Sequence, residues 1–157
     1  MAPVVDARRL VPPAARAELD RYPLTDSEAA AHEHGPLGTA AGWYYCGAGC
    51  GLLALALHEE TGLPLVGLIC ALQEADAADL EVDVMLDAGV GADGQMLCGC
   101  GWRAAVEGIE RLVAVGEAHV RALCDPADGV DPDDPPTAEA AREAARFLVD
   151  RVGVAPR

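Results

Sequence analysis

The sequence predicts an α+β domain, in which a central buried helix packs on a small, mainly antiparallel sheet with peripheral N- and C-terminal helices. Three observations predict this fold. The apolar run over residues 51–61 leaves little polar face, which indicates a central helix. Residues 80–86 alternate between apolar and polar side chains, as in a half-buried strand. Residues 138–152 carry apolar side chains at helical spacing, which predicts a helix near the C-terminus.

The N-terminal part predicts peripheral helices. Residues 1–25 form a proline-rich arm, in which 14–21 have the pattern of a short helix. A second helix is expected to begin at Thr25 or the next residue, because Thr25 and Glu28 have the spacing of a capping box. Gly35 and the proline after it are expected to end this helix.

The middle of the chain predicts most of the sheet. Gly62 is expected to end the central helix, and the apolar residues 65–70 then predict an interior strand. Residues 73–79 are small and acidic, which indicates a loop before the strand over 80–86. The glycine-rich residues 87–94 predict a hairpin loop, and 95–98 its returning strand.

The last third predicts two further helices. Apolar residues share one helical face over 102–113, and 119–123 are read as a short edge strand. Residues 125–136 are rich in aspartate and proline, which predicts an acidic, solvated linker before the C-terminal helix. Thr137 is the expected N-cap of the helix over 138–152.

The length, net charge and composition of the chain limit the classes of function that it can have. The 157 residues, 1–157, suit a single domain. The formal net charge of −15 repels nucleic acid and anionic membranes, so a protein partner is expected instead. Lysine and asparagine are absent, which is typical of a GC-rich bacterial or phage genome. Without an apolar stretch of membrane-spanning length or a secretory signal, we expect a cytoplasmic protein with reduced cysteines.

Cys50 is the candidate nucleophile. It lies between two glycines, directly before the apolar helix over 51–61. Unpaired N–H groups at the start of a helix favour negative charge, so they are expected to lower the pKa of this thiol. The aromatic residues 43–45 are expected to pack under the helix start, with the lining of a small pocket beside Cys50 as the alternative.

Over residues 43–101, this order of a thiol, a helix and a hairpin resembles the papain-like cysteine peptidase and hydrolase fold. The resemblance implies that Cys50 is the nucleophile, with a histidine on the next strand and an orienting residue on the strand after it. Asp83 stands in the expected histidine position, and 98–100 offer no acid or amide. The resemblance therefore favours a catalytically degenerate domain that acts in protein binding or assembly.

An active cysteine hydrolase or transferase is the alternative, with Cys50 attacking the substrate. It requires a histidine from elsewhere in the chain. His58 lies two turns into the central helix, whereas His32, His34 and His119 lie outside the segment that resembles the papain-like fold. His32 and His34, on either side of Glu33, have the spacing of a metal-binding pair only on a strand, where alternate residues share a face. On the expected helix they point in different directions, so both are expected to be solvated.

A metal site is the third reading. Four cysteines form two glycine-rich clusters, which the predicted fold brings near each other: Cys46, Cys50, Cys98 and Cys100. Four thiolates suit zinc or an iron–sulfur centre, whereas the alternative is that these are ordinary core or surface thiols. No other cofactor is expected. The aspartates over 125–134 lack the order of a calcium-binding loop.

Overall fold

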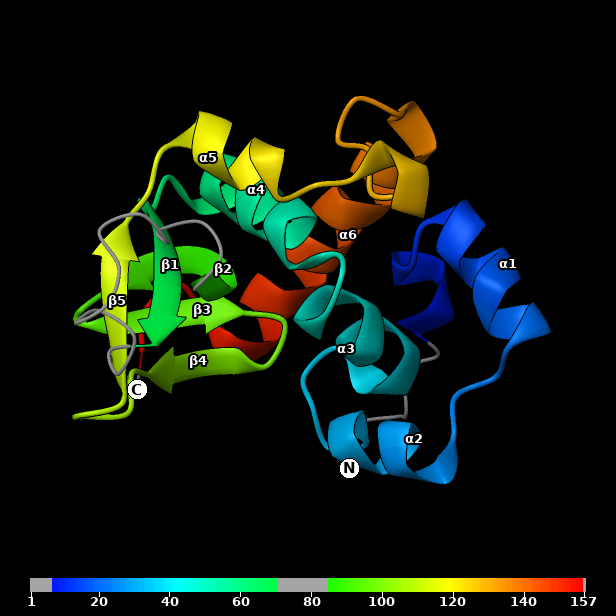
Figure 1. The fold of residues 1–157 in the computed structure, drawn as a ribbon, viewed down its shortest axis with the longest axis horizontal. Helices are drawn as coiled ribbons and strands as arrows, with labels where there is room; N and C mark the ends of the chain where they lie inside the picture. Colours follow the sequence, from blue (N-terminus) through cyan, green and yellow to red (C-terminus); the bar gives the residue numbers. More distant parts are fainter. Residues whose placement is uncertain (1–6, 71–84, 157) are drawn as a thin grey trace.

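The computed structural model describes residues 7–70 and 85–156, and these residues confirm the predicted α+β class (Figure 1). They form six α-helices, two 3-10 turns and a five-stranded antiparallel sheet. The helical elements are η1 (Ala7–Leu10), α1 (Pro13–Arg21), α2 (Asp26–His32), α3 (Gly38–Cys46), α4 (Cys50–Thr61), α5 (Glu117–Ala122), η3 (Pro126–Asp128) and α6 (Pro135–Val152). The strands are β1 (Leu65–Cys70), β2 (Met85–Ala92), β3 (Gln95–Cys98), β4 (Gly101–Ala104) and β5 (Glu110–Ala114).

The sheet has the strand order β4-β3-β2-β1-β5. Strand β1 pairs with β2 on one side and with β5 on the other, so the predicted interior strand is confirmed. The hairpin of β3 and β4 forms the opposite edge, where Cys98 pairs with Gly101 across a tight turn. This turn lies toward the end of α3 in Figure 1.

Helix α4 is the central element of the core, as predicted. It contacts the sheet chiefly through β2 and packs on α6 at another face. Its first two turns are almost entirely buried because the run of leucine and alanine has no polar side. Gly62 ends the helix in the left-handed conformation, with a φ of 73°.

The helix boundaries follow local capping signals. The predicted capping box is present: the Glu28 N–H donates to the Thr25 hydroxyl at 3.2 Å, and the Thr25 N–H donates to the Glu28 carboxylate at 2.9 Å. The C-terminal helix is confirmed, but its N-cap is Asp134 rather than Thr137. Asp134 accepts hydrogen bonds from both the N–H and the hydroxyl of Thr137.

Helix α3 is an element that we did not predict. Its aromatic residues lie in the core, where the Tyr45 hydroxyl donates to the Leu10 carbonyl at 2.6 Å. Tyr44 packs edge-on against Tyr45, and a Cβ on Gly49 would lie only 2.4 Å from the Tyr44 ring. The prediction that this aromatic segment packs under the start of the central helix is therefore confirmed for Tyr44.

The predicted helix over 102–113 is wrong. The segment forms β4 and β5, separated by a turn in which Val106 and Ile109 are 48% and 49% exposed. Residues spaced for a helical face instead enter two different strands, because pairing with β3 and β1 outweighs the local pattern. The edge strand predicted over 119–123 is also wrong, since α5 occupies that segment.

The hairpin loop predicted over 87–94 is a strand. Strand β2 continues to Ala92, and only Asp93 and Gly94 form the turn, both with positive φ. A Cβ on Gly89 would lie 2.2 Å from the Leu97 carbonyl oxygen, so this glycine permits the close approach of β3. Most of the strand predicted over 80–86, and the loop over 73–79, lie outside the described residues.

Most of residues 125–136 are exposed, as expected for a solvated linker, but the segment also contacts the core. The Asp125 carboxylate accepts the Ala127 N–H at 2.9 Å and so begins η3, and Val130 is buried.

No single helix in the described ranges is long and apolar enough to cross a membrane; α3 and α4 reach that length only as a pair bent by 100°.

Candidate functional site

The site forms where the end of α3 and the start of α4 meet the turn between β3 and β4. Gly99 in that turn lies against the last residues of α3: a Cβ there would be 3.1 Å from the Tyr45 carbonyl and 3.2 Å from the Cys46 sulfur. The missing side chain therefore lets the two segments touch. Consequently, the cysteines on either side of Gly99 lie beside Cys46.

Cys46 and Cys100 are the closest pair of thiols. Their Sγ atoms are 2.7 Å apart, although 54 residues separate them in the chain. Cys100 is exposed and Cys46 is half-buried, and both are free cysteines. A disulfide bond is about 2.05 Å long, so a small movement would join these two sulfurs.

The two thiols of this pair have opposite acidities. Hydrogen bonds from Cys46 and Cys98 lower the pKa of Cys100 to about 3, and the charges of His32 and Arg103 act in the same direction. The hydrogen bond to Cys100 and burial raise the pKa of Cys46. Of the two thiols, Cys100 is therefore the more acidic and Cys46 the less acidic.

Cys98 is a third thiol that supports Cys100. It is 1% exposed, and both its hydrogen bond to Cys100 and its burial raise the pKa of its thiol. It therefore stays protonated and donates to the Cys100 thiolate. Its sulfur also lies 3.9 Å from the Gly101 carbonyl oxygen, which is the alternative acceptor for its single proton.

Cys50, the predicted nucleophile, is the first residue of α4. Burial, followed by the charge of Asp87, raises the pKa of this thiol to about 12. The expectation that the start of the helix lowers the pKa is therefore wrong in direction. A hydrogen bond from the Ala88 backbone does lower it, but desolvation and the nearby carboxylate have the larger effect.

Asp87 links these thiols and was missed by sequence reasoning. It is a β2 residue, 8% exposed, and its carboxylate accepts the Ala88 N–H at 2.9 Å. Burial raises the pKa of this carboxyl, whereas hydrogen bonds from Cys98 and Cys50 lower it. An acidic residue inside an otherwise apolar strand is a signal, but the surrounding glycines made the segment look like a loop.

The histidines take different positions. His32 packs on α3: a Cβ added to Gly42 would lie 3.1 Å from the Cβ of His32. A positive charge on His32 lowers the pKa of Cys100. The ring of His58 lies 2.6 Å from the Leu63 carbonyl oxygen and so holds the turn after α4. In the part that the structure describes, the buried Nε2 of His119 has no hydrogen-bond partner. Asp83, in the position expected for a catalytic histidine, lies outside the described residues.

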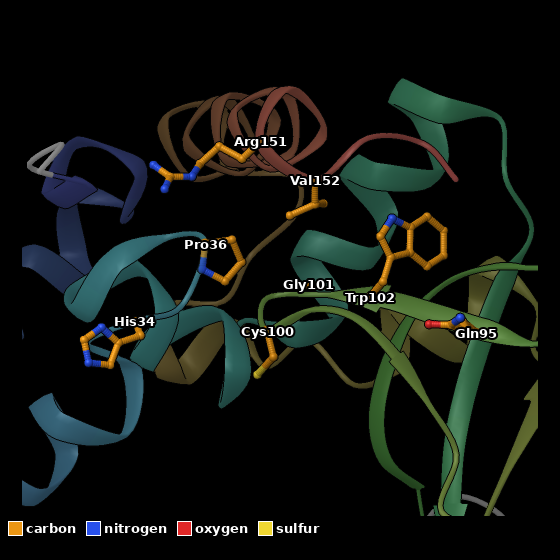
Figure 2. A pocket seen from close by; sticks show the side chains of 8 residues that line it. All are labelled: His34, Pro36, Gln95, Cys100, Gly101, Trp102, Arg151 and Val152. Atoms are coloured by element: carbon orange, nitrogen blue, oxygen red, sulfur yellow. The ribbon is translucent and has the colours of Figure 1, made fainter. Parts of the chain in front are cut away.

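A pocket of about 500 Å³ lies beside the thiol pair (Figure 2). In this view, His34 and Arg151 lie toward one side and Gln95 and Trp102 toward the other, with Cys100 between them. Its lining residues come from four parts of the chain: His34, Pro36, Gln95, Cys100, Gly101, Trp102, Arg151 and Val152.

The four predicted metal ligands do gather around one site. Cys100 interacts with both Cys46 and Cys98, and Cys50 joins them through Asp87. Among the described residues, however, no three histidine, cysteine or acidic side chains are arranged to hold a metal ion. Two sulfurs on one tetrahedral zinc lie about 3.8 Å apart, which is well beyond the 2.7 Å of the closest pair.

The remaining two cysteines do not join the thiol pair, although Cys124 lies at the start of α4, 3.3 Å from a Cβ placed on Gly51. Cys70 ends β1, and the buried Cys124 directs its thiol to the Val120 carbonyl at 3.8 Å.

Comparison of the chain with family models, curated proteins and solved structures found no match. The geometry of the thiols therefore carries the functional argument.

Proposed function

We propose that this protein is a thiol–disulfide redox protein, in which Cys46 and Cys100 alternate between a dithiol and a disulfide. The observation that carries the proposal is the 2.7 Å separation of their two sulfurs. These residues lie at the end of α3 and in the turn after β3, so a bond between them joins two parts of the core without rearranging either helix or strand.

Cys100 is the attacking thiol. It is exposed, and the lowered pKa of its thiol keeps it ionised at neutral pH. The thiolate attacks one sulfur of a substrate disulfide, the substrate S–S bond breaks, and one substrate thiolate leaves. The result is a mixed disulfide between Cys100 and the other half of the substrate.

Cys46 resolves this intermediate. The mixed disulfide removes the Cys100 thiolate, whose hydrogen bond is the largest cause of the raised pKa of Cys46. The first substrate thiolate to leave takes the Cys46 proton, the Cys46 thiolate attacks the Cys100 sulfur, and the bond from Cys100 to the substrate breaks to release the second substrate thiolate. Two electrons pass from the protein to the substrate, which is reduced to two thiols. The reverse sequence oxidises a dithiol substrate.

Burial explains why Cys100, rather than Cys50, is the nucleophile of this proposal. The pKa of about 12 keeps Cys50 protonated, and the neighbouring Asp87 carboxylate disfavours its thiolate further. Cys98 also stays protonated, so it stabilises the Cys100 thiolate as a hydrogen-bond donor instead of competing with it. This arrangement leaves one reactive sulfur beside one resolving sulfur.

Trapping the mixed disulfide tests the proposal. The reduced protein and three variants, Cys46→Ser, Cys100→Ser and Cys70→Ser, are treated with bis(2-hydroxyethyl) disulfide, an uncharged probe, and analysed by intact mass and peptide mapping. We expect the wild type to release two thiols per chain and retain no adduct. The Cys46→Ser variant should hold a stable adduct on Cys100, and Cys70→Ser should behave like the wild type.

Two results would overturn the proposal. One is an adduct in Cys46→Ser that maps to a cysteine other than Cys100. The other is a Cys100→Ser variant that still releases two thiols as rapidly as the wild type. Because serine is close to cysteine in volume, far-ultraviolet circular dichroism of each variant identifies any loss of fold.

A further inference from the structure

We infer that the pocket beside Cys100 binds a carboxylate-bearing arm of the substrate, so that the substrate class is a low-molecular-weight anionic disulfide. This inference rests on the proposed redox function of the Cys46–Cys100 pair and adds the identity of the substrate class. It is carried by the charge, the lining and the position of the pocket.

The pocket has a basic end in a strongly acidic protein. The net charge of the chain is −15, yet Arg151 and His34 both line this one cavity. The guanidinium of Arg103 also acts on Cys100 from nearby. The permanent charge of Arg151 gives an anion a favourable partner on a surface that would otherwise repel it.

Arg151 is the side chain best placed to bind that anion. In residues 7–70 and 85–156 it forms no ion pair, and its guanidinium lies 5.5 Å above the ring of Phe147. By contrast, Arg142 and Arg146 on the same helix both pair with Glu139. Arg103 is also committed, because it pairs with Glu110 at 3.2 Å. Arg151 therefore keeps a free planar fork, which suits a carboxylate.

The rest of the lining suits the carbon chain of a small molecule. Pro36, Val152 and Trp102 supply apolar surface, and the indole N–H of Trp102 donates to the Gly153 carbonyl at 3.0 Å. That hydrogen bond fixes the ring as one wall. A volume of about 500 Å³ is within the range of small-ligand pockets.

The position of Cys100 indicates how the substrate lies. In Figure 2 its sulfur is at the margin of the pocket and points away from Val152. A disulfide held by one arm in the pocket therefore has its S–S bond at the margin, where the thiolate is exposed. The second arm extends into solvent, so only one half of the substrate is recognised.

A matched set of aliphatic disulfides tests the inference. The rate of adduct formation at Cys100 is measured at neutral pH and low salt with 3,3′-dithiodipropionate (anionic), bis(2-hydroxyethyl) disulfide (neutral) and cystamine (cationic). We expect the anionic probe to react fastest and Arg151→Gln to slow it by about tenfold. The neutral probe should react equally with both proteins. The control is Arg146→Gln, which removes the same charge from the same helix without touching the pocket.

The outcomes separate this inference from the proposed function. If cystamine reacts fastest, or if Arg151→Gln and Arg146→Gln slow the anionic probe equally, the anionic-pocket inference is wrong while the redox function stands. If no probe forms an adduct at Cys100, the proposed function itself fails. Added salt should reduce the preference for the anionic probe, because it screens exposed charges.

Discussion

Gly99 lies so close to Tyr45 that a Cβ on the glycine would approach the tyrosine carbonyl carbon and oxygen to 3.1 Å. This contact joins the turn after β3 to the last turn of α3, and it places Cys100 beside Cys46. The geometry of the thiol pair therefore depends on a residue that has no chemistry of its own.

Gly99→Ala should weaken both the fold and the thiol pair. The atoms that an added methyl group would meet are mostly backbone, which yields little, so we expect a loss of about 1–3 kcal/mol in the free energy of unfolding. Urea denaturation under reducing conditions measures this loss. Gly116→Ala is the control, because a Cβ at Gly116 meets no atom within 4 Å. Equal stability of the two variants would contradict the steric argument.

The two adjacent tyrosines should respond differently to loss of their hydroxyl groups. Tyr45→Phe leaves the buried Leu10 carbonyl without its 2.6 Å hydrogen bond, which should cost about 1–3 kcal/mol. In the described residues, the buried Tyr44 hydroxyl has no hydrogen-bond partner, so Tyr44→Phe should be neutral or stabilising. Thermal unfolding of both variants measures the contrast. A larger loss for Tyr44→Phe would show that this hydroxyl is satisfied in solution.

Alkaline pH should destabilise the reduced protein. Burial raises the pKa of Cys50 from 9.0 to about 12 and that of Tyr44 from 10.0 to about 12. Between pH 9 and 12 the unfolded chain releases these protons while the folded chain keeps them, so stability present below pH 9 is lost as pH rises. Urea midpoints at pH 8 and pH 10.5 measure the decrease, and Cys50→Ala should make it smaller. An identical decrease in Cys50→Ala would exclude that thiol as a contributor.

Asp87→Asn should make Cys50 more reactive. The Asp87 charge raises the pKa of the Cys50 thiol, second only to burial, so its removal should shift that pKa part of the way back toward 9.0. We expect iodoacetamide to label Cys50 about three to ten times faster at pH 9. Peptide mass spectrometry measures the rate. Asp93→Asn is the control, because Asp93 lies in the exposed turn after β2; a similar increase there would refute a local charge effect.

The elements that sequence reasoning predicted correctly carry strong local signals. Helix α4 has an apolar run with a glycine stop, and α2 has a capping box formed by residues only three apart. The sequence also predicts helix α6, but it indicates Thr137 as the N-cap, whereas the structure has Asp134. Here the two candidate caps lie within one turn and hydrogen-bond to each other, so sequence alone does not separate them.

The errors lie where pairing between strands outweighs a local pattern. Residues 102–113 have helical spacing, yet β4 and β5 take their conformation from β3 and β1. Glycines made residues 87–94 resemble a loop, whereas Gly89 is needed because Leu97 on β3 approaches so closely. Neither long-range contact leaves a signal within the segment itself.

The cysteines of the site were predictable, but their roles were not. The two glycine-rich clusters indicated that Cys46 and Cys100 lie near each other, and the structure brings them together. Sequence order alone favoured Cys50 as the reactive thiol because it begins a helix. Reactivity depends on burial and on hydrogen bonds from distant residues, and these lower the pKa of Cys100 and raise that of Cys50.

Identification of the disulfide in the oxidised protein tests the central claim most directly. The reduced wild-type protein is equilibrated with a glutathione redox buffer, its free thiols are blocked by alkylation at low pH, and its peptides are mapped by mass spectrometry without reduction. The structure predicts one linkage, between Cys46 and Cys100, which forms and is lost reversibly as the buffer changes, while Cys70 and Cys124 remain free. A dominant linkage between other cysteines, or no disulfide across the whole range of the buffer, would contradict it.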